Sequence, residues 1–316
     1  MLFYFAPMEG ITGYIYRNAH ARYFGGIDKY FTPFIMPNQN RCMNTKELND
    51  VLPEHNQGME IVPQILTNKA EDFINAAEKL KELGYSEVNL NLGCPSRTVV
   101  SKGKGAGFLE YPDRLEEFLN CIFERSSLKI SVKTRLGMYE PEEFNRLLEI
   151  FNKFPLSELI IHSRVQTDYY KNKPVLESYR KAEESSENIL CYNGDVFTRQ
   201  DYEAAVSGFT RTNAVMMGRG LLRNPNLVHN IRQGAQTDKK ILKAFHDEIY
   251  EGYREILPGE KPVLFKMKEL WTYMLVSFSD AEKCWKKIKK ADRLTAYELA
   301  VTELFAEKDI DKSKCI

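Results

Sequence analysis

The sequence predicts an α/β protein: a (β/α)8 TIM barrel followed by a small all-helical C-terminal domain. Three observations support this fold class: short apolar runs recur roughly every 30 residues, helical patterns fill most gaps between them, and only helical patterns follow residue 236. We therefore expect a barrel over residues 1–236 and a helical domain over residues 237–316. A doubly wound open sheet stays an alternative, because spacing alone does not specify how strands pair.

Eight runs rich in β-branched and aromatic residues are the expected strands. Several are apolar at nearly every position, which is typical of parallel strands that are buried on both faces. The expected strands cover residues 2–8, 29–34, 59–66, 87–94, 129–136, 158–164, 189–195 and 214–218.

Helices are expected between the strands and after them. Pro112 and Pro141 mark first helical turns, Gly84 is typical of the residue that follows a helix, and Thr198 is suited to cap one. The interstrand helices are expected over residues 68–83, 112–123, 141–154 and 199–207. The C-terminal helices are expected over residues 239–257, 263–277, 280–290 and 294–306.

Charge and cysteine content exclude several protein classes. Lys plus Arg and Asp plus Glu are each 44, so the formal net charge is zero and RNA binding would need a local basic surface. The 6 cysteines form no CxxC pair, so no metal site is expected. No secretory pattern and no long apolar run is present, so we expect a cytoplasmic protein without a membrane partner. We also expect a monomer.

Polar residues stand at the carboxyl ends of seven of the eight expected strands. Barrel enzymes carry their catalytic groups at this edge. These residues are Met8 and Glu9, Gln64, Asn91 with Cys94, Lys133 with Arg135, His162 with Arg164, Asn193-Gly194-Asp195, and Gly218-Arg219-Gly220.

Cys94 lies in the loop sequence Asn-Leu-Gly-Cys-Pro-Ser, before a glycine-rich segment at residues 101–107. A thiol with an ordinary pKa of about 8.5 is mostly protonated at neutral pH. It can act as a general acid, or as a nucleophile if a base such as His162 activates it. The glycine-rich segment lacks the Gly-Lys-Ser/Thr of a P-loop and is expected to form a mobile lid carrying Lys102 and Lys104.

Lys133 interrupts an apolar strand, so we do not expect its side chain to be fully solvated. It could form a Schiff base or place positive charge beside an anionic cofactor. Asn193-Gly194-Asp195 and Gly218-Arg219-Gly220 end the last two strands, where barrels commonly bind phosphate.

A basic segment lies near the C-terminus. Lys283, Lys286, Lys287 and Lys290 share one face of the expected helix. The face is either simply solvated or a contact surface for RNA phosphates.

Together the motifs resemble the tRNA-dihydrouridine synthase family over about residues 3–230. The order and spacing of the set carry the resemblance, rather than any single motif. The matching segments are Ala6-Pro7-Met8-Glu9-Gly10, Asn89-Leu90-Asn91-Leu92-Gly93-Cys94-Pro95-Ser96, Val132-Lys133-Thr134-Arg135, His162-Ser163-Arg164, Asn193-Gly194-Asp195, and Met217-Gly218-Arg219-Gly220 with Asn224-Pro225.

The resemblance implies an FMN barrel that uses NADPH to reduce the 5,6 double bond of uridines in tRNA. Cys94 would be the proton donor. Substrate would contact Asn91, Arg135, Arg164, Lys286, Lys287 and Lys290. FMN would contact Pro7, Met8, Glu9, Gln64, Lys133, His162, Asn193, Gly194, Asp195, Gly218 and Arg219.

Four alternatives stay open. The chain could be a flavin barrel reductase for a small molecule, a Schiff-base aldolase built on Lys133, or a non-catalytic RNA-binding barrel. A dihydrouridine synthase acting on another structured RNA is the fourth. The sequence departs from the usual family pattern at Gly13, Pro33 and Val165.

Overall fold

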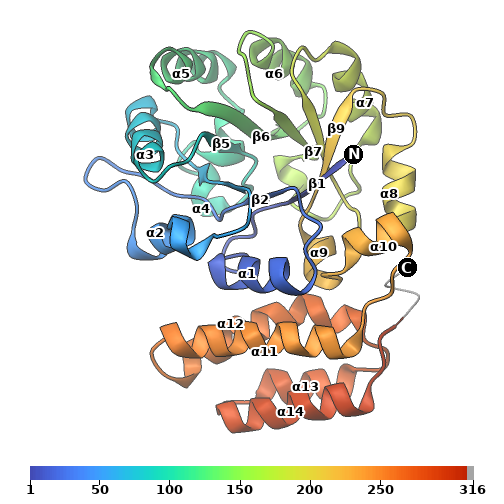
Figure 1. Ribbon diagram of the computed structural model, residues 1–316. Helices are drawn as coiled ribbons and strands as arrows, with labels where there is room; N and C mark the ends of the chain where they lie inside the picture. The colour runs from blue at the N-terminus through green and yellow to red at the C-terminus, as the bar shows by residue number, and fades with distance from the viewer. Residues whose placement is uncertain (312–316) are drawn as a thin grey trace. The chain divides into compact units, whose positions relative to one another are not determined.

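The computed structural model describes residues 1–311, and the chain divides into two compact units (Figure 1). The first unit comprises Met1–Pro7, Asp28–Asp195 and Ser207–Met217. The second comprises Met8–Ile27, Val196–Val206 and Gly218–Ile316. All strands that the structure describes belong to the first unit, and the second is built from helices. A separate helical domain over residues 237–316 stays a prediction.

Within residues 1–311 the strands form one parallel nine-stranded sheet in the order β3-β2-β1-β9-β8-β7-β6-β5-β4. Its strands are β1 (Leu2–Phe5), β2 (Lys29–Phe31), β3 (Ile61–Val62), β4 (Gln64–Ile65), β5 (Glu87–Leu92), β6 (Lys129–Gly137), β7 (Leu159–Val165), β8 (Leu190–Asn193) and β9 (Thr212–Met217).

The two ends of this sheet, β3 and β4, are separated in the chain only by Pro63. Proline has no backbone N–H to give to a sheet ladder, so it divides one strand into two short pieces. The Pro63 carbonyl still accepts the Asn89 N–H at 2.8 Å. β3 and β4 together are therefore the third of eight barrel strands. The predicted TIM barrel is confirmed, and the open-sheet alternative is wrong.

The barrel strands are buried as the apolar runs predict. Every residue of β5 and β7 is buried, as expected for parallel strands covered on both faces. The core cluster inside the barrel contains Tyr4, Ala6, Phe31, Val62, Ile160, Cys191, Ala214 and Met216.

Ionisable side chains close the amino end of the barrel, and we call Tyr4, Lys29, Glu87 and Glu158 the floor cluster. Lys29 Nζ lies 2.8 Å from Glu87 Oε2, and the Tyr4 hydroxyl donates to Glu158 Oε1 at 3.1 Å. Burial raises the pKa of Glu158 to about 7, although the positive charge of Lys29 opposes this shift. The cluster joins β1, β2, β5 and the residue before β7.

The longer helices of the first unit lie outside the sheet (Figure 1). In α5, Pro112 is the first residue, and Leu115, Phe118, Leu119 and Ile122 are buried along one face. The helical elements of this unit are α2 (Thr45–Val51), η1 (Pro53–His55), α3 (Ala70–Glu82), α4 (Arg97–Val100), η2 (Gly105–Phe108), α5 (Pro112–Arg125), α6 (Glu143–Phe151), η3 (Gln166–Asp168) and α7 (Leu176–Ser185).

Two helix termini in this unit test the sequence signals. α3 ends as predicted, because Gly84 has a φ of +94° and its N–H bonds the Lys81 carbonyl. α6 begins at Glu143, two residues later than Pro141 suggested, because the Glu143 carboxylate accepts the N–H groups of Met138, Tyr139 and Glu140 and holds that segment in a turn.

The second unit contains α1 (Tyr14–Tyr23), α8 (Arg199–Val206), α9 (Arg219–Arg223), α10 (Leu227–Gln233), α11 (Lys239–Ile256), α12 (Glu260–Met274), η4 (Leu275–Ser277), α13 (Glu282–Lys290) and α14 (Leu294–Glu307). Thr198 caps α8, since its Oγ1 accepts the Asp201 N–H at 3.1 Å. Tyr297 Oη lies 2.8 Å from Trp271 Nε1 and 2.6 Å from His246 Nε2, which joins α11, α12 and α14 in a buried hydrogen-bond network.

Candidate active site

The candidate site lies at the carboxyl ends of the first unit's strands and is built in layers. Strand register places Asn91, Lys133, Ile160 and Cys191 side by side. Side chains two residues further along a strand point to the same face. The next layer is therefore Arg135, His162 and Asn193, and Arg164 and Asp195 follow it. The period of two brings these predicted residues to one edge of the barrel.

A chain of buried amide groups fixes the deepest polar residues. Asn91 Nδ2 donates to Gln64 Oε1 at 2.6 Å, and Gln64 Nε2 donates to Asn89 Oδ1 at 2.7 Å. Asn89 Nδ2 then donates to Ser131 Oγ at 3.0 Å. Each amide can satisfy this chain in only one orientation, because its nitrogen donates and its oxygen accepts. Asn89 and Ser131 thus determine how Gln64 and Asn91 face the site.

The same chain positions Cys94. Asn91 Oδ1 accepts the N–H groups of Gly93 at 3.0 Å and Cys94 at 2.9 Å, so it holds the turn in which the thiol stands. The Cys94 side chain is partly exposed, which leaves it accessible to a substrate. The predicted proton donor therefore has a fixed backbone.

The glycine-rich segment after Cys94 differs from the expected lid. Lys102 is exposed and Lys104 partly so, but residues 105–109 are buried and contain η2. Ala106 N–H donates to the Cys94 carbonyl at 3.1 Å. A side chain at Gly107 would come within 2.6 Å of the Val100 carbonyl oxygen. The glycines allow a close approach of two backbones, and only the residues before Gly105 project outward.

Arg135 is fully buried and donates to three backbone carbonyls. Nε reaches Gly93 at 2.9 Å, Nη1 reaches Val165 at 2.9 Å and Nη2 reaches Tyr169 at 3.0 Å. Burial lowers the pKa of this guanidinium, although it stays positively charged at neutral pH. In this state Arg135 connects the turn before Cys94 to the loop after β7, and its contact with substrate stays a prediction.

Arg164 forms a bidentate ion pair with Asp195, with distances of 3.2 Å to Oδ1 and 2.5 Å to Oδ2. Its Nη1 also donates to His162 Nε2 at 3.1 Å. A guanidinium cannot accept a hydrogen bond, so Nε2 carries the lone pair and the neutral ring carries its proton on Nδ1. Arg164 therefore sets the tautomer of His162.

Lys133 gives the site its electrostatic character. Burial lowers its pKa to about 8 and the charge of Arg135 contributes in the same direction, while the thiols of Cys191 and Cys94 oppose the shift. The groups that shift its pKa include no carboxylate. With Arg135 and Arg164 nearby and only Asp195 opposing them among the predicted residues of the first unit, this edge favours an anionic ligand.

Gly194 and Asn193 form the end of β8. A Cβ atom at Gly194 would lie 2.1 Å from the Tyr192 hydroxyl oxygen, so any other residue there would displace the Tyr192 ring. Asn193 Nδ2 donates to the Met216 carbonyl of β9 at 2.8 Å. The turn after β8 is thus held close to the sheet, as a site for a phosphate group requires.

Other predicted residues belong to the second unit. Met8, Glu9, Gly218 and Arg219 lie there, whereas Pro7 is the last residue of a first-unit segment. Met8 N–H donates to Thr12 Oγ1 at 2.8 Å, and the Arg219 guanidinium stands 5.5 Å from the centre of the Phe197 ring. Their roles toward a cofactor stay predictions.

The predicted RNA-contacting lysines are exposed on α13, whose Cys284 and Ile288 are buried. Lys286 and Lys290 extend from the exposed face. Lys287 bonds the Glu303 carboxylate of α14, which raises its pKa. One charge of the face is therefore offset locally.

Tyr170 is a site residue that sequence reasoning missed. Its ring lies 5.5 Å from the Arg135 guanidinium and 6.1 Å from the His162 ring, and the residue is 45% exposed. Asn89 and Ser131 were missed as well. The alternation of polar and apolar residues along β5 could have revealed Asn89, because the polar residues at 87, 89 and 91 share one face of that strand.

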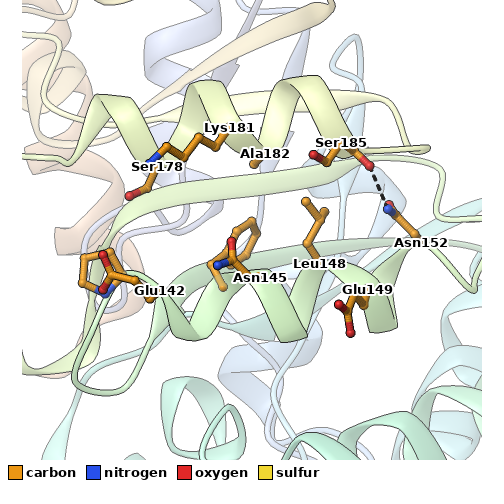
Figure 2. Close-up of a pocket in the computed structure, with 11 residues that line it drawn as sticks. Glu142, Asn145, Leu148, Glu149, Asn152, Ser178, Lys181, Ala182 and Ser185 are labelled. Carbon is orange, nitrogen blue, oxygen red and sulfur yellow. Dashed lines mark hydrogen bonds between the residues drawn. The ribbon is translucent and has the colours of Figure 1, made fainter.

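A hollow of about 270 Å³ lies elsewhere in the first unit, between α6 and α7 (Figure 2). Asn152 Nδ2 donates to the Ser185 carbonyl at one end of it, at 2.9 Å. Its lining includes no predicted site residue. Because barrel chemistry takes place at the carboxyl ends of strands, this hollow is not the candidate site.

Comparisons with known proteins identify the family of this chain. The model of the family described as "Dihydrouridine synthase (Dus)" matches residues 4–304. The chain belongs to the dihydrouridine synthase family. It is 29% identical over 231 residues to a "Probable tRNA-dihydrouridine synthase" of Staphylococcus aureus (strain COL), covering 71% of this chain and 69% of the relative. It is 25% identical over 242 residues to "tRNA-dihydrouridine synthase B" of Pasteurella multocida (strain Pm70), covering 76% and 71%.

Solved structures agree with the barrel of this dihydrouridine synthase. Histamine dehydrogenase from Rhizobium sp. 4-9 has a TM-score of 0.55 at 11% identity, covering 73% of this chain and 45% of that one. Morphinone reductase has a TM-score of 0.51 at 14% identity, covering 75% and 87%. At such identities the likeness establishes the fold alone.

Family membership has two consequences for the site. It implies a flavin cofactor, and the cationic edge with its half-buried Lys133 suits the anionic groups of a flavin nucleotide. It also excludes the aldolase alternative. No helix within residues 1–311 is long and apolar enough to cross a membrane, and no group of three His, Cys, Asp or Glu in that range is arranged to hold a metal ion.

Proposed function

We propose that this dihydrouridine synthase reduces the 5,6 double bond of uridines in tRNA, with FMN as cofactor and NADPH as reductant. One observation carries the proposal: the Asn91 side chain holds the Cys94 turn beside Lys133 at the carboxyl edge of the barrel. That edge combines a fixed acid and a half-buried cation in a chain of this family.

Bound FMN, reduced by NADPH, supplies the hydride that adds to C6 of the uracil ring. Hydride addition leaves negative charge at C5 and O4, and an acid must then protonate C5. Cys94 donates this proton from Sγ, and the hydrogen bond from its N–H to Asn91 Oδ1 keeps the turn in place. The thiolate that results regains a proton from solvent, because the side chain is partly exposed.

Lys133 and His162 serve to bind the cofactor. The ammonium group of Lys133 offsets negative charge at the flavin, and it needs no protein carboxylate to do so. His162 donates from Nδ1, since Arg164 occupies Nε2. The first unit's other contributions to binding FMN come from Pro7, Gln64, Asn193, Gly194 and Asp195.

Substrate RNA must present its target base outside the stack, because an enzyme cannot reach C5 and C6 within a folded helix. The exposed lysines at 286, 287 and 290 of α13 contact phosphates of the folded RNA. Asn91, Arg135 and Arg164 contact the nucleotide at the barrel edge, and Arg135 exchanges a carbonyl partner when substrate enters.

The experiment is a product assay on the purified protein. The cofactor is released and identified by mass, and dihydrouridine is then measured in unmodified tRNA incubated with protein and NADPH. Dihydrouridine in tRNA supports the proposal. A flavin-loaded protein that oxidises NADPH only with small enones or uracil, and leaves tRNA unchanged, contradicts it and favours the small-molecule reductase. If uridines are reduced in another structured RNA but not in tRNA, the proposed reaction stands and the proposed substrate is wrong.

A further inference from the structure

Helix α12 of the second unit presents an aromatic side chain to solvent. Phe265 is 68% exposed, although residues on the other face of the helix, including Val263, Met267 and Trp271, are buried. An exposed phenylalanine adds nothing to the helical core. Its ring offers a rigid apolar surface that a ligand can cover.

The surroundings of Phe265 are basic. On the helix surface Lys261 lies one turn before it and Lys268 three residues after it, and Lys266 is adjacent in sequence. The ammonium group of Lys268 donates to the Ala291 carbonyl, which fixes its position between α12 and the end of α13. The acidic residues of this face are Glu260, which lies 3.7 Å from Arg293, and Glu269.

This face is continuous with a segment that belongs to a site motif. Lys266 Nζ donates to the Gly10 carbonyl, and a Cβ at Gly10 would lie 3.6 Å from Glu269 Oε2. Gly10 ends the Ala6–Gly10 motif, which contains Met8 and Glu9. Phe265 therefore stands one residue from a lysine that is bonded to this motif.

We propose that Phe265 stacks on an unpaired base of the substrate RNA, while the lysines around it contact the adjacent phosphates. The inference rests on the proposed function, since it takes a folded RNA to be the substrate. A base offers a flat face to an aromatic ring whatever its identity, and its backbone carries the negative charge that lysines bind. A protein partner is a poorer match, because the cores of protein interfaces are depleted in lysine.

The test compares Phe265→Ala and Phe265→Trp with wild type, in the full-length flavin-loaded protein. The measurements are the Kd for an unmodified tRNA transcript and the rate at which NADPH reduces the bound flavin. Loss of one stacked base is worth about 1–3 kcal/mol, so Phe265→Ala should weaken tRNA binding about 5- to 150-fold. Phe265→Trp should retain affinity, and its added fluorescence should be quenched when tRNA binds. Flavin reduction should not change.

Leu299→Ala is the matched control. Leu299 is 70% exposed on α14 of the same unit, and its neighbours one turn away, Thr295, Ala296, Thr302 and Glu303, include no cation. Its Kd for tRNA should equal that of wild type. Equal affinity of Phe265→Ala and Leu299→Ala overturns the stacking proposal and leaves the proposed function intact. A wild-type protein that neither binds nor reduces tRNA overturns the proposed function itself.

Discussion

Both ends of the barrel carry charged side chains, but they use them differently. At the amino end, Lys29 stands 2.8 Å from Glu87, and Glu158 accepts a hydrogen bond from Tyr4. At the carboxyl end, Lys133 has only thiols and Arg135 among the groups that shift its pKa. The floor cluster satisfies its lysine within the protein, while the carboxyl end leaves the half-buried cation of Lys133 for a ligand. Charge therefore serves stability at one end and binding at the other.

The largest effect is expected from removing the proposed proton donor. Cys94→Ala should lower dihydrouridine formation about 100- to 10,000-fold, the usual contribution of a general acid, while flavin content stays at the wild-type level. Product is measured in tRNA under single-turnover conditions. Cys121→Ala, at another partly exposed thiol on α5, is the control. Undiminished product from Cys94→Ala would remove Cys94 from the mechanism.

A matched pair of lysine substitutions tests the division between the two ends directly. Lys133→Met should weaken flavin binding about 100-fold, because one charge-assisted contact is lost, and should barely change the free energy of unfolding of the apoprotein. Lys29→Met should leave flavin binding unchanged. It should lower the free energy of unfolding by about 2–3 kcal/mol, because it leaves Glu87 largely buried and without its lysine partner. Flavin titration and urea unfolding measure the two quantities. If both variants lose stability and neither loses flavin, the two ends of the barrel do not divide stability and binding between them.

The pH dependence of stability should report the floor cluster. Burial raises the pKa of Glu158 to about 7, whereas an unfolded glutamate titrates near 4.3. Between these values the folded protein binds more protons than the unfolded chain, so the free energy of unfolding should fall as pH rises through this window. The fall is roughly 3–4 kcal/mol for a shift of this size. Urea unfolding from pH 4.5 to 8 tests it, and an unchanged slope in Glu158→Gln would assign it to another group.

The smallest effect concerns the amide chain beneath the site. Ser131→Ala removes the acceptor of Asn89 Nδ2 and should cost about 1 kcal/mol of stability. It should also slow uridine reduction a few-fold by loosening Gln64 and Asn91. Ser163→Ala is the control, because Ser163 is buried and its Oγ makes no hydrogen bond to the described residues. If the two variants reduce uridine at equal rates, Ser131 contributes to stability and does not help to position the site residues.

The barrel could be predicted because the strands are apolar runs and seven of the eight runs end in polar residues. The floor cluster could not, since Tyr4 and Glu158 are 154 residues apart and their pairing depends on how the sheet closes. The division of the third strand at Pro63 was readable in principle, because proline lacks a ladder donor. The glycine-rich segment was misread because glycine serves tight backbone contact as well as flexibility. The Arg164–Asp195 pair joins two residues that were assigned to different ligands.

Arg135 has a consequence for how this edge moves. One guanidinium binds the carbonyls of Gly93, Val165 and Tyr169, so none of these segments can open far without breaking a bond to a fully buried charge. The turn of Cys94 and the loop after β7 should therefore open as one cooperative unit, with matching hydrogen-exchange rates. A nucleotide that draws Arg135 away would release both segments together, so substrate arrival and loop rearrangement become a single event.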